Sequence, residues 1–103
     1  SFIYSLHLHV KTERSVSFYA NEANLSSSHF TRIVKDKTGK TPSEWIADMT
    51  GVNAKLLLEQ SGMSIKEIAA ELNFPEQFTF HKFFKLHVGV PPKEYRLKNR
   101  AKE

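Results

Sequence analysis

Two short sets of residues carry side chains whose types and spacing are suited to recognising a nucleic acid. Each set follows the spacing of one face of a helix and supplies hydroxyl, amide, imidazole or cationic groups. Arg and Lys suit the O6 and N7 acceptors of guanine, Gln suits the adenine edge, and an apolar side chain suits the thymine methyl group. The first set is Ser27, Ser28, Thr31 and Arg32, and the second set is Gln77, Phe78, His81 and Lys82.

Basic residues gather beside both sets. Four basic residues between positions 32 and 40 are opposed by a single acidic residue, and seven from position 82 onward are opposed by two. The net charge of the chain is only +4 at pH 7, so the placement of charge is more informative than its total. Such clusters indicate a polyanionic partner, and a solvated basic face is the alternative. The candidates for contacts to phosphate groups are Lys35, Lys37, Lys85, Lys93 and Arg96.

Other chemistries lack a motif in this sequence. There is no nucleophile elbow, phosphate-binding loop or metalloprotease motif, so we predict a protein that is not an enzyme and needs no cofactor. His7 and His9 are two residues apart, which a helix does not place on one face, so no metal site is expected. The absence of Cys excludes disulfides and agrees with a cytoplasmic protein. The sequence has no run of about 18 apolar residues, so we expect no transmembrane helix.

The two sets lie in two copies of one repeated unit. Residues 30–45 match residues 80–95 at an offset of 50, whereas residues 15–25 match residues 64–74 at an offset of 49. One residue is therefore inserted near positions 75–77. Two copies are too few for a solenoid, so we interpret the chain as a tandem of two small helical modules. Among the matched pairs are Phe30 with Phe80, Lys35 with Lys85, Gly39 with Gly89, Pro42 with Pro92 and Glu44 with Glu94.

The stretch between the copies, residues 41–60, is predicted to be a long helix. Thr41 is suited to cap it, and Glu44 to complete a capping box. About 20 residues at ~1.5 Å each give a length of roughly 30 Å. Gly51 inside this helix is expected to cost about 1 kcal/mol relative to Ala, and Asp48 and Glu59 are interpreted as a solvated face. The predicted buried face is Trp45, Met49, Val52 and Leu56, widened by Ile46, Leu57 and Leu58.

The whole pattern predicts an all-α fold of seven helices without strands. Ser26 is placed to cap one helix, and Ser64 with Glu67 forms a capping box for another. Asn24 and Asn73 stand in turns that favour a left-handed backbone. The aromatic residues expected in the core are Phe30, Trp45, Phe80, Phe84 and Tyr95. The predicted helices span residues 2–11, 15–23, 27–37, 41–60, 65–72, 76–87 and 92–95.

Each copy joins a short helix to a second helix across a turn of three to four residues, which is the helix-turn-helix unit. In such a unit the second helix lies in the DNA major groove, with its N-terminal residues at the base edges. Both sets of polar residues fall on these second helices. We expect residues 1–103 to form one DNA-binding domain, with a first lobe at about 1–40, a linker helix at about 41–60 and a second lobe at about 64–98.

The two copies resemble the halves of the DNA-binding domain of AraC/XylS-family transcription regulators, over the stretch from Ser15 to Arg96. The resemblance implies a linker helix that spaces two reading helices in successive major grooves, about 34 Å apart. It also implies a sensing or dimerising domain that precedes this one, and the start at Ser1 without Met agrees with a piece of a longer protein. The signature residues are Ile68, Ala69, Leu72, Phe74, Phe80, Phe84, Lys85, Gly89, Val90, Pro92, Tyr95 and Arg96.

Four positions depart from the family pattern. Asn73 stands where Gly is usual, Gly51 lies inside the linker helix, and Thr50 replaces a basic residue that would contact phosphate. Phe78 is a large apolar residue at a reading position, where it either packs on a thymine methyl group or leans on its own lobe.

We therefore predict the sequence-specific DNA-binding module of a bacterial transcription regulator, with double-stranded DNA as its partner and RNA polymerase as a further candidate. The alternative is a helical protein-interaction adaptor whose basic faces meet an acidic partner. Matched polar and basic residues on both second helices favour the first reading, because an adaptor does not need them. The operator, the effector, the choice between activation and repression, and the oligomeric state are not determined by the sequence.

Overall fold

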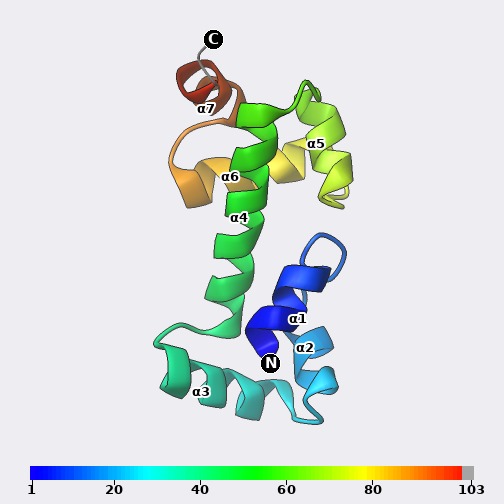
Figure 1. The fold of residues 1–103 in the computed structure, drawn as a ribbon, viewed down its shortest axis with the longest axis vertical. Helices are drawn as coiled ribbons and strands as arrows, with labels where there is room; N and C mark the ends of the chain where they lie inside the picture. The colour runs from blue at the N-terminus through cyan, green and yellow to red at the C-terminus, as the bar shows by residue number, and fades with distance from the viewer. Residues whose placement is uncertain (101–103) are drawn as a thin grey trace. The chain divides into compact units, whose positions relative to one another are not determined.

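The computed structural model describes residues 1–100, and within them it has seven α-helices and no β-strand (Figure 1). The predicted all-α fold of seven helices is confirmed. The first helix ends at His9 rather than at residue 11, and the last continues to Asn99 rather than ending at Tyr95. None of the described helices is both long and apolar enough to cross a membrane. The helices are α1 (Phe2–His9), α2 (Val16–Glu22), α3 (Ser27–Thr38), α4 (Pro42–Gln60), α5 (Ile65–Glu71), α6 (Gln77–Val88) and α7 (Pro92–Asn99).

Reciprocal side-chain caps start two helices where the sequence predicts them. At α5, the Ser64 hydroxyl accepts from the Glu67 N–H at 3.0 Å, and the Glu67 carboxylate accepts from the Ser64 N–H at 2.8 Å. At α4, Thr41 and Glu44 make the same pair of bonds at 3.2 and 2.8 Å. The bond from the Thr41 N–H holds the pKa of Glu44 below its ordinary value. Both capping boxes therefore satisfy backbone donors that a helix start leaves unpaired.

The same turn connects the two helices of each helix-turn-helix pair. Asn24 and Asn73 both adopt the left-handed conformation, with φ of 59° and 61°. The N–H of the following residue then donates to the carbonyl oxygen of Ala20 at 3.0 Å or of Ala69 at 2.9 Å. Helix α3 begins three residues after Asn24, whereas α6 begins four residues after Asn73. The inserted residue of the second copy therefore lies in this turn, ahead of the second helix.

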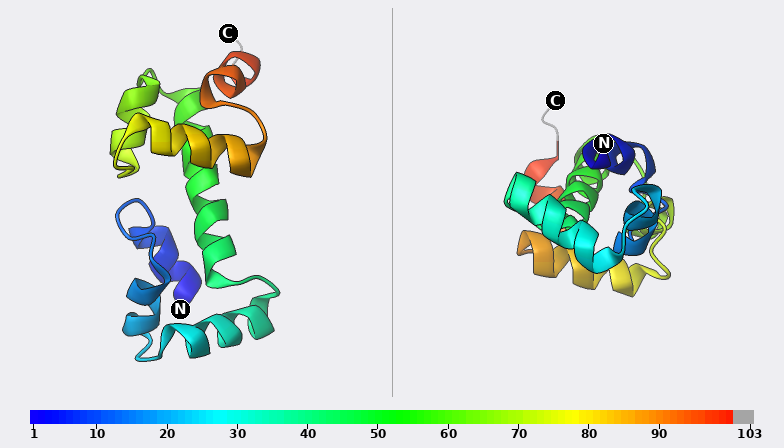
Figure 2. Two further views of the ribbon diagram at one scale, coloured as in Figure 1. Left: turned by 180° about the vertical axis from the view of Figure 1, so that it is seen from behind. Right: turned by 90° about the horizontal axis from the view of Figure 1, so that it is seen from below.

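The chain folds into two compact units, and α4 contributes to both. Unit 1 is Ser1–Met49, and unit 2 begins at Thr50. In unit 1, α1 and α3 pack against α2, and in unit 2, α5 and α7 pack against α6 (Figure 2). In unit 2 the second helix of the pair, α6, thus packs against both a first helix and a supporting one, whereas in unit 1 the supporting helix α1 packs against the first helix, α2.

Each unit has a core that is rich in aromatic side chains, as predicted. Phe30 is buried in unit 1, and Phe80 and Phe84 are fully buried in unit 2, with ring centroids 5.8 Å apart. The Tyr95 ring meets Phe84 edge-on at 5.5 Å. Trp45 and Tyr95 are only half-buried, and each packs against the core of its own unit. These contacts fix which faces of α3 and α6 point inward.

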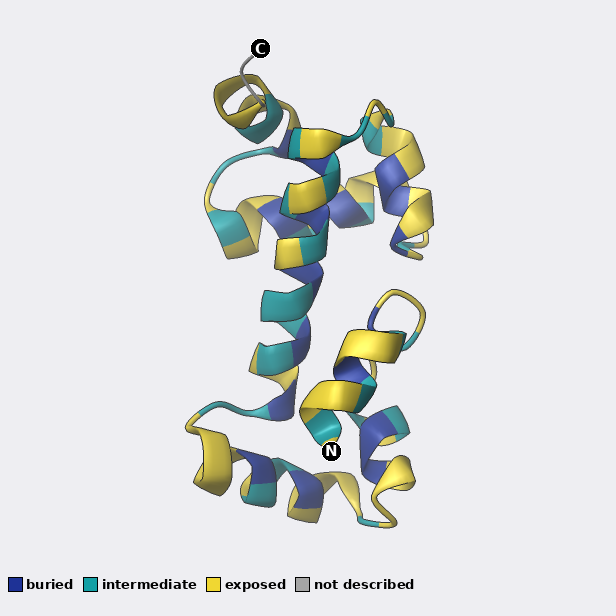
Figure 3. Ribbon diagram, viewed as in Figure 1, coloured by how far each residue is buried: buried dark blue, intermediate teal, exposed yellow. Residues whose placement is uncertain are grey.

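The buried face of α4 agrees with the predicted one only in part, at Ile46 and Leu58. Its buried stripe is Ile46, Thr50, Ala54 and Leu58, which recur every four residues (Figure 3). Two members of the predicted face, Val52 and Leu56, are instead 50% and 46% exposed. The prediction ranked positions by side-chain hydrophobicity, whereas close packing here places a hydroxyl and a methyl group inside.

Gly51 has a packing role that explains its place inside α4. A Cβ atom at this position would lie 3.0 Å from Cδ2 of the His87 ring, on the last turn of α6 in the same unit. The His87 ring is in turn stacked on Phe83, with centroids 5.5 Å apart. Gly51 therefore leaves room for the His87 ring beside α4, which gives this residue of low helix propensity a packing role.

Tyr95 joins α7 to the end of α4. Its hydroxyl donates to the carboxylate of Glu59, which the sequence had placed on a solvated face. Burial raises the pKa of Tyr95 from 10.0 to about 12, and the hydrogen bond and negative charge of Glu59 add to this shift.

We expect this contact to make the stability of unit 2 depend on alkaline pH. A tyrosine whose pKa is raised on folding stabilises the fold fully below its unfolded value of about 10. That contribution is lost as the pH rises from 10 to about 12. Denaturant unfolding of wild type and Tyr95→Phe across this range should therefore show a steeper loss for wild type. The exposed Tyr4 offers the control Tyr4→Phe, and equal pH slopes in wild type and Tyr95→Phe would refute the expectation.

Candidate nucleic-acid interface

Helix α3 presents the first predicted set of residues on its outer face. Phe30 and Val34 point into the core of unit 1, so the opposite side of the helix is left to solvent. Ser27, Ser28 and Arg32 are exposed, and Thr31 is half-buried. None of these four side chains makes a hydrogen bond or ion pair within residues 1–100. Their polar groups are therefore available to a partner outside the protein.

Helix α6 presents the second set in the same way. Phe80 and Phe84 are its buried residues, and the four residues of the set are all exposed. The Phe78 ring is 62% exposed and belongs to neither core, so it does not lean on its own lobe. The ammonium of Lys82, one turn further along, lies 5.5 Å from the centre of this ring. The set, read along the helix, is Gln77, Phe78, His81 and Lys82.

The two helices begin differently. In α3, the Ser26 hydroxyl accepts from the His29 N–H at 3.2 Å, which is the cap that the sequence predicts. In α6, the N-cap residue is Glu76, and its side chain makes no capping bond. At the repeat offset of 50 the residue equivalent to Ser26 is Glu76, so the second copy has no Ser at this position.

The predicted phosphate-contacting lysines lie at the ends of helices and point to solvent. Lys35 and Lys37 are in the last turn of α3, Lys85 is in the last turn of α6, and Lys93 is in the first turn of α7. All four are exposed, and none forms an ion pair within the described residues. Cations in a last helical turn are also favoured by the helix dipole. Each unit therefore offers exposed positive charge near its outer polar face.

Lys40, by contrast, is engaged within unit 1. Its ammonium lies 2.5 Å from a carboxylate oxygen of Asp48 and 4.1 Å from the centre of the Trp45 ring. Asp48 is thus a partner for Lys40, in a surface ion pair in which the two side chains are 40% and 41% exposed. The basic cluster of the first copy is reduced by one charge as a result.

Arg96, a predicted phosphate contact, is engaged within unit 2. Its Nε donates to the carbonyl oxygen of Leu58 at 2.9 Å, and its Nη2 donates to those of Leu57 and Ser61 at 3.4 Å. Burial lowers the pKa of the guanidinium, and the nearby Arg100 lowers it further. The side chain thus satisfies carbonyl groups that the end of α4 leaves unpaired. The contact of Arg96 with a phosphate group stays a prediction.

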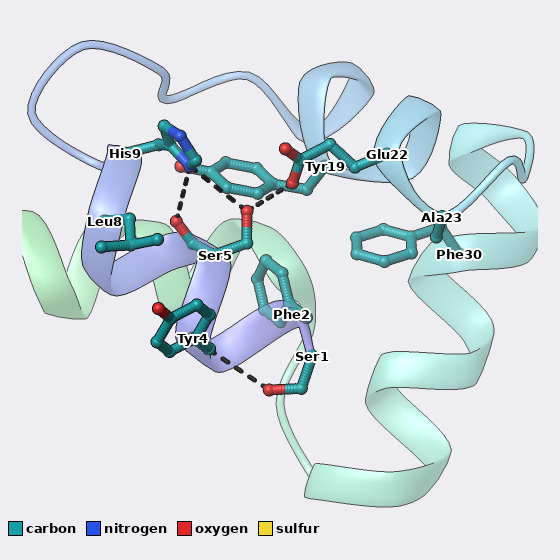
Figure 4. A pocket seen from close by; sticks show the side chains of 10 residues that line it. All are labelled: Ser1, Phe2, Tyr4, Ser5, Leu8, His9, Tyr19, Glu22, Ala23 and Phe30. Carbon is teal, nitrogen blue, oxygen red and sulfur yellow. Dashed lines mark hydrogen bonds between the residues drawn. The ribbon is translucent and has the colours of Figure 1, made fainter.

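Unit 1 also contains an open pocket of about 510 Å³, which is distinct from the predicted interface. Its walls come from α1, α2 and Phe30, and at its rim the Ser5 hydroxyl lies between His9 and Glu22 (Figure 4). None of the predicted base-reading or phosphate-contacting residues lines it. The pocket is therefore not part of the surface that α3 presents.

A family model described as a helix-turn-helix domain matches residues 19–98. This match covers most of the chain, so the chain belongs to that family, in its AraC-type branch, as the resemblance predicted. It is a helix-turn-helix DNA-binding domain of the kind found in transcription regulators.

The relatives are bacterial regulators that are longer than this chain. An uncharacterized HTH-type transcriptional regulator of Escherichia coli, YidL, is 37% identical over 90 residues, which cover 87% of this chain and 30% of that protein. The probable transcription factor PqrA of Proteus vulgaris is 35% identical over 77 residues, covering 75% of this chain and 63% of that protein. The chain therefore spans between about a third and two thirds of the length of these relatives.

Solved structures share the fold. The DNA-binding domain of the global transcriptional factor AdpA, solved in complex with a target DNA, has a TM-score of 0.81 and 27% identity, with 93% of this chain and 86% of that chain covered. The C-terminal domain of the response regulator yesN from Fusobacterium nucleatum has a TM-score of 0.85 and 23% identity, with 92% and 93% covered. The second likeness concerns the fold alone.

Proposed function

We propose that α3 and α6 are the two reading helices of this domain and enter successive major grooves of one DNA duplex. The observation that carries the proposal is the matched outer face of the two helices. In both, the side that faces away from aromatic core residues exposes polar side chains that make no hydrogen bond or ion pair within residues 1–100. Such free donors and acceptors near a helix N-terminus are what base recognition requires.

The roles of individual residues follow from their position on these helices. Residues of the first two turns would face base edges, and lysines of the last turn, or of the next helix, would face phosphates. We assign base reading to Ser27, Ser28, Thr31, Arg32, Gln77, Phe78, His81 and Lys82. We assign phosphate contacts to Lys35, Lys37, Lys85 and Lys93.

Further domains and partners are proposed in addition to DNA. We infer that a sensing or dimerising domain precedes this one in the full protein, because longer regulators match only in part. RNA polymerase would be contacted if the regulator is an activator. A cytoplasmic location is the one in which bacterial DNA is accessible, and no catalytic activity is proposed.

Arg32→Ala is expected to lose about 1–3 kcal/mol of binding free energy on the preferred duplex and to relax the choice of base at one position. The reason is that the exposed guanidinium, one turn into α3, can address O6 and N7 of a guanine with two parallel bonds. Lys37→Ala, at the end of the same helix, is the matched control. It should weaken binding to all sequences alike, because a phosphate contact carries no base information.

The measurement is fluorescence anisotropy on a panel of duplexes in which one base pair at a time is varied. Both substituted residues are exposed, so thermal melts of the two variants should match that of wild type. If Arg32→Ala lowers affinity evenly over the panel, as Lys37→Ala should, Arg32 is a phosphate contact and its assignment as a base reader fails.

A further inference from the structure

Phe78 stands out among the residues of the reading faces because its side chain is aromatic and unburied. It is the second residue of α6, and its ring is 62% exposed among polar and cationic neighbours. Other apolar side chains in unit 2 are also exposed, including Leu86 at 89%. Leu86, however, lies in the last turns of α6, whereas Phe78 lies in the first turn, where base edges are met.

The fold itself does not require an aromatic ring at this position. At the repeat offset of 50, the residue of the first copy that corresponds to Phe78 is Ser28, which is exposed on the first turn of α3. Both copies nevertheless build the same left-handed turn. Both also bury a phenylalanine two residues after this position, Phe30 in the first copy and Phe80 in the second. Single exposed apolar residues are common on protein surfaces, so what distinguishes Phe78 is its place on the first turn of α6, where base edges are met.

Lys82 makes the ring part of a larger unit. Its ammonium lies 5.5 Å from the ring centre, within the range of a cation–π interaction. The negative face of the ring thus attracts the ammonium and restricts where its three donors lie. Successive base pairs are about 3.4 Å apart along the duplex, so the ammonium lies within one or two base-pair steps of whatever the ring contacts.

We propose that Phe78 selects a thymine through its 5-methyl group and that Lys82, held beside the ring, selects a guanine within two base pairs of that thymine. The methyl group of thymine is the one apolar feature of the major-groove edges, and O6 and N7 of guanine are the acceptors that suit an ammonium. The inference rests on the proposed function, because it assigns bases to residues of the α6 reading face.

The test replaces each thymine of the preferred duplex with deoxyuridine, which keeps the base pair and removes only the methyl group. Loss of one buried methyl group should weaken wild-type binding about fourfold at a single position. Phe78→Ala should bind the thymine and deoxyuridine duplexes equally. Leu86→Ala, which removes an even more exposed apolar side chain from the same helix, should keep the fourfold difference.

Lys82 is tested on the same duplexes by varying the base pairs on either side of the methyl-sensitive position. Lys82→Ala should lose the preference for guanine there, by about fivefold or more, and should keep the methyl sensitivity. The inference is overturned if no thymine is methyl-sensitive in wild type, or if Phe78→Ala retains the sensitivity. In those cases a sequence preference elsewhere in the site would still support the proposed function, whereas no preference for any sequence would overturn both.

Discussion

Replacing Phe84 with alanine is expected to lower the free energy of unfolding of unit 2 by about 3–5 kcal/mol. The ring is fully buried and contacts both Phe80 and Tyr95, so its removal opens a cavity between α6 and α7. A small domain is stable by only about 5–15 kcal/mol in total, so a loss of this size removes much of the margin.

Thermal and denaturant unfolding followed by circular dichroism would measure the effect. Leu86→Ala is the control, because Leu86 lies on the same helix and is 89% exposed. Its substitution should change the free energy of unfolding by about 0.5 kcal/mol or less. Equal effects of the two substitutions would mean that the inward face of α6 has been assigned to the wrong residues.

The second large effect is expected from salt. If Lys35, Lys37, Lys85 and Lys93 each neutralise one phosphate, log K should fall against log salt with a slope of about −3.6. If the cationic base readers Arg32 and Lys82 also release one counterion each, the slope would reach about −5.4. Between 50 and 200 mM salt the affinity for DNA should therefore fall about 10²- to 10³-fold.

Anisotropy titrations of one duplex at several salt concentrations would give this slope. The double variant Lys35→Ala with Lys37→Ala removes two phosphate contacts and should make the slope shallower by about 1.8. Lys40→Ala should change the slope little. Lys40 is the matched control because its ammonium is already paired with Asp48. A flat salt dependence would instead favour a protein-interaction adaptor.

Structural features that depend on only a few neighbouring residues were predicted from the sequence. Ser64 with Glu67 predicts a capping box, and Asn24 and Asn73 predict left-handed turns. In each case the residues that cause the structure lie within a few positions of one another. The internal repeat made it possible to predict the whole fold from these local features, since the two copies are expected to bury equivalent residues. The outer faces of α3 and α6 then followed from helical spacing alone.

Contacts between residues far apart in the chain were not predicted. Arg96 bonds to carbonyl groups at the end of α4, 35–39 residues away, and no local pattern distinguishes it from a lysine that faces solvent. The buried stripe of α4 was predicted at Ile46 and Leu58 but not at Thr50 and Ala54, because neither of the latter stands out by hydrophobicity. Gly51 was taken for a cost because its neighbour, His87, comes from another helix.

The central claim, that α3 and α6 each read bases in one duplex, is tested most directly by selecting binding sites from a random duplex pool. Wild type should enrich two blocks of preferred bases, about 10 base pairs apart between centres. Arg32→Ala should change one block and Gln77→Ala the other, because the two residues lie on different reading helices. Recovery of the same motif with wild type and both variants, or of no motif with wild type, would contradict the account.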